Sequence, residues 1–192
     1  MLPPTLARME SLGHKVFKNP KHDYDLNIYG IRNKEAGSPN TFNDHVGVFY
    51  LWDGCWRNHV WSATVDPGSF WLENPMSVKG TAVLAPGQYR GAYELGKHRG
   101  QYWALTQVGE VTVWRDPNRD STPDRWGKKE TGFFGINIHK AGKISTQIDK
   151  WSAGCQVFQR EKDFEEFMDI CRKQVSICGF KTFTYTLLDQ WW

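Results

Sequence analysis

The stretch FGINIHKAGKISTQIDKWSAGCQVF, residues 134–158, carries the clearest structural pattern in the chain. Over residues 134–139, Ile136 and Ile138 alternate with glycine and polar residues. Successive side chains of a strand point to opposite faces, so this alternation predicts a strand with Asn137 and His139 on the same face. After a polar loop, the stretch continues with a turn of small residues and a short apolar run.

The turn consists of Ser152, Ala153 and Gly154, and Cys155 follows it directly. Small residues leave backbone amides free to face a ligand. Thiol-based acyl transfer needs an imidazole that takes the thiol proton, a thiolate that attacks a carbonyl, and amides that hold the oxyanion. The sequence therefore indicates an enzyme with Cys155 as nucleophile and His139 as base. The alternative that stays open is a buried apolar cysteine beside a structural histidine.

Neighbouring groups are expected to complete this chemistry. The backbone amides of Gly154 and Cys155 are expected to form the oxyanion hole. Ser152 or Asn137 is expected to orient the imidazole. Trp151, next to the turn, is expected to lie near the site.

Four segments within residues 45–160 form an ordered pattern. They are a strand–turn–strand pattern around Asp53 and Gly54, the run LAPGQY at residues 84–89, Ile138-His139, and SAGC at residues 152–155. In kind and order they resemble the L,D-transpeptidase catalytic domain, a family of cysteine enzymes that remodel bacterial peptidoglycan. Lys140, Ala153 and Val157 depart from the pattern, because the family has a glycine, a second histidine and an arginine there.

The resemblance implies cysteine-dependent acyl transfer or hydrolysis at L,D peptide bonds of peptidoglycan stem peptides. An amine acceptor would give a cross-link, and water would give carboxypeptidase or endopeptidase activity. Substrate contacts are expected at Tyr89, Arg90, Trp151, Ala153 and Gln156. A substrate carboxylate could be bound, in place of the missing arginine, by any of four cations: Lys140, Lys143, Lys150 and Arg90.

Two other functions stay open. The missing arginine and second histidine motivate a catalytically silent virion or cell-wall-binding component with the same fold. A zinc peptidase would have to recruit His98, His139 and an aspartate, although no zinc-ligand spacing is present. No cofactor is required by the thiol chemistry.

The predicted fold class is mainly β (α+β), an L,D-transpeptidase-like β-sandwich or barrel with one long C-terminal helix packed on it and a final strand. The helix is expected over residues 163–178, where apolar side chains recur at helical spacing, and Gly179 is its expected stop. Residues 182–187 alternate as a strand with one buried face. A hairpin is expected around Asp53 and Gly54. Further strands are expected over residues 82–93, 103–108 and 110–114, and a surface excursion over residues 66–79.

The chain is expected to be one globular unit with two parts. Residues 1–44 form an N-terminal extension, with a short helix in residues 1–20 that ends near Asn19 and Pro20, an edge strand over residues 25–32 and a loop over residues 33–43. Residues 45–192 form the catalytic domain. The terminal pair Trp191 and Trp192 leaves two roles open, packing back on the domain or a contact surface toward a virion component or a second copy of the chain.

Asp116, Asn118, Asp120, Thr122 and Asp124 place an oxygen-bearing side chain at every second position. This spacing resembles the first nine positions of an EF-hand loop and suits Ca²⁺. Serine at the sixth position and glycine at the twelfth depart from that pattern. A solvated acidic turn is the alternative, since Asp and Asn favour turns in any case.

Composition limits the partners. The 192 residues carry a net charge of +3, which suits an anionic wall polymer, and no basic run interleaved with aromatics suggests nucleic acid. No apolar stretch is long enough for a membrane span, and no secretory signal is expected at the N-terminus. The four cysteines, Cys55, Cys155, Cys171 and Cys178, are expected to be free thiols. A bacteriophage lysin or virion part, made in the cytoplasm and acting on the cell wall after release, fits these features.

Overall fold

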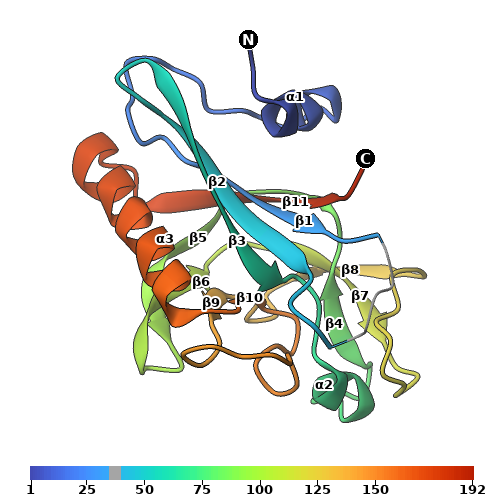
Figure 1. Cartoon of the computed structure of the whole chain (residues 1–192). Coiled ribbons are helices and arrows are strands. Elements are labelled where there is room, and N and C mark those ends of the chain that lie inside the picture. Colours follow the sequence, from blue (N-terminus) through green and yellow to red (C-terminus); the bar gives the residue numbers. More distant parts are fainter. Residues whose placement is uncertain (35–39) are drawn as a thin grey trace.

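The computed structural model of the chain describes residues 1–34 and 40–192. Strands dominate the described residues (Figure 1). Those that form the larger sheet are β1 (Asn27–Arg32), β2 (Asp44–Trp52), β3 (Cys55–Thr64), β5 (Gly87–His98), β6 (Tyr102–Gln107), β9 (Ile138–Lys140), β10 (Gln156–Phe158) and β11 (Thr182–Asp189). They close into a barrel in the spatial order β1-β11-β5-β6-β9-β10-β3-β2.

A smaller sheet stands beside the barrel. It consists of β4 (Thr81–Leu84), β7 (Val111–Asp116) and β8 (Lys129–Gly132), in the order β4-β7-β8. Chain order alone suggested one strand over residues 82–93, but Ala85 and Pro86 separate β4 from β5, and the two strands belong to different sheets. Proline has no N–H to donate to a ladder, which favours the break at this point.

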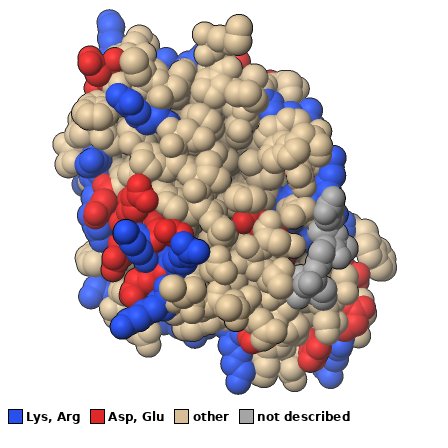
Figure 2. Space-filling view, in the orientation of Figure 1, with Lys and Arg blue, Asp and Glu red and all other residues tan. Residues whose placement is uncertain are grey.

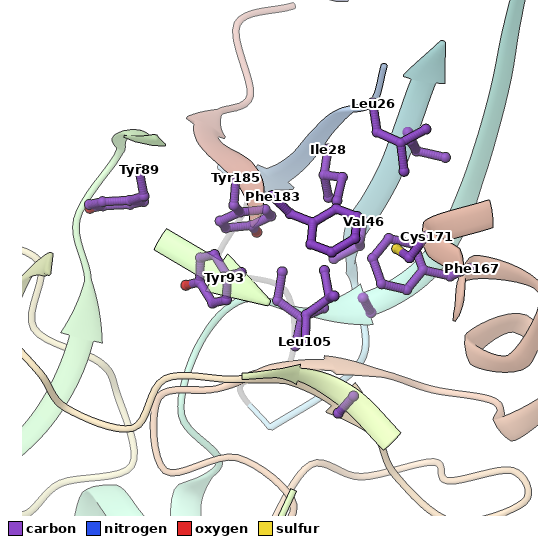
Figure 3. Close-up of a cluster of buried hydrophobic side chains, with 14 of the residues drawn as sticks. Leu26, Ile28, Val46, Tyr89, Tyr93, Leu105, Phe167, Cys171, Phe183 and Tyr185 are labelled. Atoms are coloured by element: carbon purple, nitrogen blue, oxygen red, sulfur yellow. The ribbon is translucent and has the colours of Figure 1, made fainter. Parts of the chain in front are cut away.

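The barrel interior is filled by large apolar side chains. Ile28, Val46 and Phe183 lie side by side at its centre, and Tyr93 and Leu105 approach them from the opposite wall (Figure 3). Each of these residues is at most 2% exposed. The predicted mainly β fold is therefore confirmed, as a closed barrel.

The predicted C-terminal helix is also confirmed. Helix α3 (Glu161–Lys173) continues into a π-helical turn η1 (Gln174–Cys178), and Gly179 ends it at a φ of +73°. Its apolar stripe, with Phe164, Phe167 and Cys171, is buried against the barrel core. Its outer side carries mixed acidic and basic residues, visible at the left of Figure 2.

Several predicted details of the strands are corrected. β1 is not an edge strand, because it pairs with β11 on one side and β2 on the other. β11 is buried on both faces rather than one, since Thr184 and Thr186 are buried as well. The strand predicted over residues 134–139 is shorter and begins at Ile138. Gly135 has a φ of +70°, and the side chain of Gln107 accepts the N–H of Ile136, so the backbone there leaves the sheet.

The predicted hairpin around Asp53 and Gly54 is confirmed as β2 and β3. The N-terminal helix is shorter than predicted: α1 runs over Pro4–Ser11, and Gly13 follows at a φ of +77°. Leu6 of this helix packs on the outer face of the barrel. The excursion over residues 66–79 contains the short helix α2 (Ser69–Glu73).

A buried arginine joins the two sheets. The Arg32 side chain is 1% exposed, its Nε lies 3.0 Å from Asp66 Oδ1, and its Nη2 donates to Leu84 O at 2.8 Å. Asp44 belongs to the same charged group, and burial together with the charge of Asp66 raises the pKa of its carboxyl to about 7. This cluster fixes the end of β1 against β4.

Within residues 1–34 and 40–192, no helix is long and apolar enough to cross a membrane. The loop predicted over residues 33–43 lies mostly outside the described residues. All four cysteines are free thiols. Of the terminal pair, Trp191 packs on the apolar cluster around α1, whereas Trp192 is exposed.

Candidate functional site

The fold places His139 and Cys155 in neighbouring segments, β9 and the turn that leads into β10. β9 and β10 are parallel, with Ile138 opposite Gln156 and His139 opposite Val157. Paired residues point to the same face, so His139 shares the face of Val157, and Cys155, directly before β10, packs on the apolar cluster that contains Val157. Ile138 lies in the barrel core, and this face is therefore the outer one.

Contacts to His139 define its tautomer. Its Nδ1 lies 2.8 Å from the carbonyl oxygen of Lys140 and 3.2 Å from the hydroxyl of Tyr102. A carbonyl oxygen only accepts hydrogen bonds, so Nδ1 carries the proton and Nε2 keeps its lone pair. Burial lowers the pKa of His139 to about 3, assisted by the neighbouring His98 and the charge of Arg99. The imidazole is therefore neutral, with Nε2 unprotonated, and a weaker base than an exposed imidazole.

Cys155 is held just outside the strand. Its Sγ lies 3.4 Å from the backbone nitrogen of Asn137 and 3.5 Å from the carbonyl oxygen of Gly135. The residue is partly exposed and packs on the small apolar cluster that includes Ile148 and Val157. Desolvation in these surroundings raises the pKa of the thiol to about 11.

Within the described chain, the sulfur makes no hydrogen bond to the imidazole. Its hydrogen bonds go to Asn137 and Gly135. Proton transfer therefore requires a side-chain rotation of Cys155 or a bridging group, as is common in free enzymes whose catalytic contacts tighten on substrate binding. Both groups are neutral at rest, so thiol deprotonation and attack would have to occur together.

This neutral resting state predicts a distinctive pH profile for thiol alkylation. Because the raised pKa of Cys155 leaves little thiolate at neutral pH, the rate should rise about tenfold per pH unit from pH 7 to 10 and level off only near pH 11. Iodoacetamide labelling, followed at Cys155 by peptide mass spectrometry, measures this. A plateau below pH 8 would instead indicate a thiolate–imidazolium pair.

The turn before Cys155 is stabilised by hydrogen bonds of the buried Ser152 side chain. Ser152 is fully buried, donates its hydroxyl proton to Cys155 O at 2.8 Å and accepts the N–H of Gly154 at 3.2 Å. Gly154 has a φ of +123°, and a Cβ there would lie 2.5 Å from Ala82 O, so only glycine fits. Ser152 therefore stabilises the turn and does not orient the imidazole. The Gly154 amide was expected in the oxyanion hole, but it donates its hydrogen bond to the Ser152 hydroxyl.

Asn137 also has another role than expected. Its side-chain nitrogen donates to His98 Nδ1 at 3.0 Å, and its side-chain oxygen accepts the N–H of Gln107 at 2.9 Å. It therefore orients His98, whose ring stacks on His139 with centroids 4.0 Å apart. The backbone amide of Asn137 lies 3.4 Å from the sulfur, and no backbone hydrogen bond in the described parts of the chain uses the Cys155 amide.

Three residues were not expected at the thiol site from the sequence: Arg99, Tyr102 and His98, which was considered only as a zinc ligand. They lie at the turn between β5 and β6, where Arg99 has a φ of +50°. Arg99 is exposed, forms no ion pair within residues 1–34 and 40–192, and its positive charge lowers the pKa of both His98 and His139. The sequence predicted strands over residues 82–93 and 103–108 but not the extension of β5 to His98, and the pairing of β6 with β9 brings the tip of this hairpin to His139.

The expected substrate contacts are dispersed. Gln156 is fully buried and accepts the Tyr185 hydroxyl at 2.7 Å. Tyr89 is also buried, with its hydroxyl bonded to Ala85 O. Both side chains face the interior and not the thiol. Arg90 lines a separate hollow of about 770 Å³, beside η1 and β11.

Two expected contacts remain at the surface near the turn. Trp151 is 44% exposed. Ala153 lines a hollow of about 260 Å³, whose other walls include Trp71, Phe134 and Arg115. This hollow adjoins the Cys155 turn, since Ala153 belongs to the turn and Phe134 precedes Gly135, whose carbonyl oxygen lies 3.5 Å from the sulfur.

Two of the four candidate cations for a substrate carboxylate are engaged elsewhere. Lys140 is paired with Glu161. The ammonium of Lys150 lies 4.3 Å from the ring centre of Phe70. Arg99 is the cation whose charge reaches Cys155 as well as the two histidines.

No three His, Cys, Asp or Glu side chains in the described residues are already grouped as metal ligands. His98 and His139 stack ring on ring instead of converging through their nitrogens. Nothing in this arrangement supports the zinc peptidase alternative over the thiol.

Comparison with known proteins gives no match to a family model, a curated protein or a solved structure. The function therefore has to be inferred from the chemistry of the site itself.

Proposed function

We propose that this chain is a cysteine acyl-transfer enzyme of the L,D-transpeptidase type, acting on L,D peptide bonds of peptidoglycan stem peptides. The observation that carries the proposal is the pairing of β9, which carries His139, with β10, which Cys155 directly precedes, together with the contact that fixes Nδ1 of the imidazole at the carbonyl of Lys140. That contact leaves Nε2 as the only proton acceptor of the ring, which a general base requires.

The reaction follows from these atoms. Nε2 of His139 takes the proton of the Cys155 thiol as the sulfur attacks the scissile carbonyl carbon. The oxyanion receives hydrogen bonds from the backbone N–H groups of Asn137 and Cys155. The carbon–nitrogen bond then breaks, the leaving amine takes the proton from Nε2, and a thioester remains on Cys155.

The second half of the reaction, attack on the thioester, determines the product. An amine or water attacks the thioester, Nε2 accepts its proton, and the sulfur leaves and regains a proton as the free thiol. An amine yields a cross-link, whereas water yields a trimmed peptide. The partly open hollow lined by Ala153 would hold one side of the substrate, and the hairpin tip with Arg99 would hold the other.

Incubation of the purified chain with stem-peptide fragments tests the proposal. Mass spectrometry should find an acyl adduct on Cys155, or trimmed or cross-linked peptide. Cys55→Ser removes an exposed thiol far from the site and should leave the result unchanged. An adduct that maps to Cys55, or no turnover at all, would contradict the proposal.

One observation favours a second candidate, a catalytically silent virion or cell-wall-binding domain. The pKa of the Cys155 thiol is raised, and in the described residues the thiol makes no hydrogen bond to the His139 imidazole. A silent domain would bind purified sacculi with no adduct and no product. Action on the cell wall, after release from the cell or as part of a virion, is the expected setting for either candidate.

Arg99 is the proposed recognition residue for a substrate carboxylate. Replacing it with alanine should raise KM about 10- to 100-fold for a peptide with a free carboxylate and leave kcat within about threefold, because charge-assisted hydrogen bonds to a bound ligand are lost. Steady-state kinetics with that peptide and its amide-capped analogue measures this. Lys97→Ala, an exposed cation on the same hairpin, is the control. An equal effect on the capped peptide would exclude recognition of the carboxylate.

A further inference from the structure

The loop between β7 and β8 contains the acidic motif that the thiol chemistry does not use. It begins at Asp116, the last residue of β7, and runs to Lys129, the first residue of β8. In Figure 1 this loop extends at the lower right, and Figure 2 shows acidic and basic atoms gathered there. The loop joins two strands of the smaller sheet, and none of its residues belongs to the proposed active site.

Asp116 is unusual for an aspartate at a loop. Its side chain is completely buried, and its Oδ1 has no hydrogen-bond partner in the described residues. Its Oδ2 accepts the backbone N–H of Asp124 at 2.9 Å, which turns the carboxylate into the loop that it begins. A buried carboxylate oxygen without a partner is costly, and such an atom is commonly satisfied by a bound water or ion.

Two more carboxylates approach from the same loop. The side-chain nitrogen of Asn118 donates to Asp120 Oδ2 at 3.0 Å and to Asp124 Oδ2 at 3.2 Å, so it lies between the two groups. The charges of Asp124 and Asp120 also act on Asp116, whose pKa is raised mainly by burial. None of the three aspartates forms an ion pair in the described chain, because Arg115 pairs with Glu130 and Arg125 with Asp66.

We propose that this loop binds one Ca²⁺ ion through Asp116, Asn118, Asp120, Thr122 and Asp124. Asp116 Oδ1 supplies the buried anchor, and the carboxylates of Asp120 and Asp124 close on the ion. The Asn118 amide turns so that its oxygen replaces its nitrogen between them. Thr122 falls at the seventh position, where such loops supply a main-chain carbonyl.

Calcium fits better than magnesium. An oxygen-only set on a long, irregular loop suits the six to eight flexible ligands of Ca²⁺, whereas Mg²⁺ demands a compact octahedron and keeps its waters. The twelfth position holds Gly127 in place of the bidentate glutamate of an EF-hand. The affinity should therefore be in the range of extracellular modules, with a Kd of about 0.1–1 mM.

Titration of the EGTA-treated, dialysed full chain with CaCl₂ tests the proposal by calorimetry and thermal melting. One site per chain should be detected, and 10 mM CaCl₂ should raise Tm by about 3–5 °C. MgCl₂ at the same concentration should raise it by less than about 1 °C. No heat and no shift with CaCl₂ would overturn the proposal, and so would an equal response to both ions.

Two matched variants locate the ion. Asp120 is exposed, so Asp120→Ala should fold normally and bind Ca²⁺ at least about tenfold more weakly. Asp169→Ala removes an exposed carboxylate on α3 and should bind like the native chain. Unchanged binding by Asp120→Ala would place the ion elsewhere. Since none of these measurements uses catalysis, they stand or fall apart from the proposed enzyme function.

Discussion

Cys155→Ala should abolish turnover of stem-peptide fragments, with kcat at least about 10⁴-fold lower, because no other side chain on this face can form the acyl intermediate. Its Tm should stay close to that of the native chain, since the thiol makes only two weak hydrogen bonds, to Asn137 and Gly135. Product formation by mass spectrometry and a melting curve on the same preparation measure both.

His139 should act as one unit with the thiol. His139→Gln should lower kcat about 10²–10⁴-fold, the usual range for a general base. The double variant with Cys155→Ala should be no worse than Cys155→Ala alone, since groups that act together are not additive. Effects that multiply in the double variant would show that His139 supports the fold and not the proton transfer.

The small-residue turn before Cys155 and a strand that carries His139 were predictable from the sequence, although the strand begins at Ile138 and Ile136 lies outside it. Local patterns of this kind report which face a side chain takes and where a turn falls. The hairpin around Asp53 and Gly54 and the stripe of α3 were predictable for the same reason.

What the sequence could not provide were the pairings between distant segments. Tyr102 contacts His139 because β6 pairs with β9, and no local pattern determines that pairing. Ser152 was predicted to orient the imidazole. Its side chain is instead buried under the turn, where its hydroxyl donates to the backbone oxygen of Cys155. β1 was placed at an edge because its parallel partner, β11, lies at the far end of the chain.

Arg32→Met should be the most destabilising single change among the charged residues described above. It would leave Leu84 O without its donor and the carboxylate of Asp66 with Arg125 as its remaining partner. Breaking a buried ion pair from one side costs about 3–5 kcal/mol. Guanidinium unfolding should show this loss, and Tm should fall by roughly 10 °C.

An exposed arginine gives the matched control. Arg172 is 50% exposed and pairs with Asp169 on the surface of α3, so Arg172→Met should change stability by less than about 0.5 kcal/mol. Adding Asp66→Asn to Arg32→Met should recover part of the loss, because the orphaned charge is then removed.

Loss of Arg32 should also lower activity at temperatures below the unfolding transition. Arg32 holds β4 at Leu84, and Ala82 of the same strand presents the carbonyl against which Gly154 packs. Loosening β4 should therefore let the Cys155 turn move and lower kcat at temperatures well below Tm, while Arg172→Met leaves it unchanged. If Arg32→Met kept full activity up to its own melting transition, the turn would be positioned by the barrel strands alone.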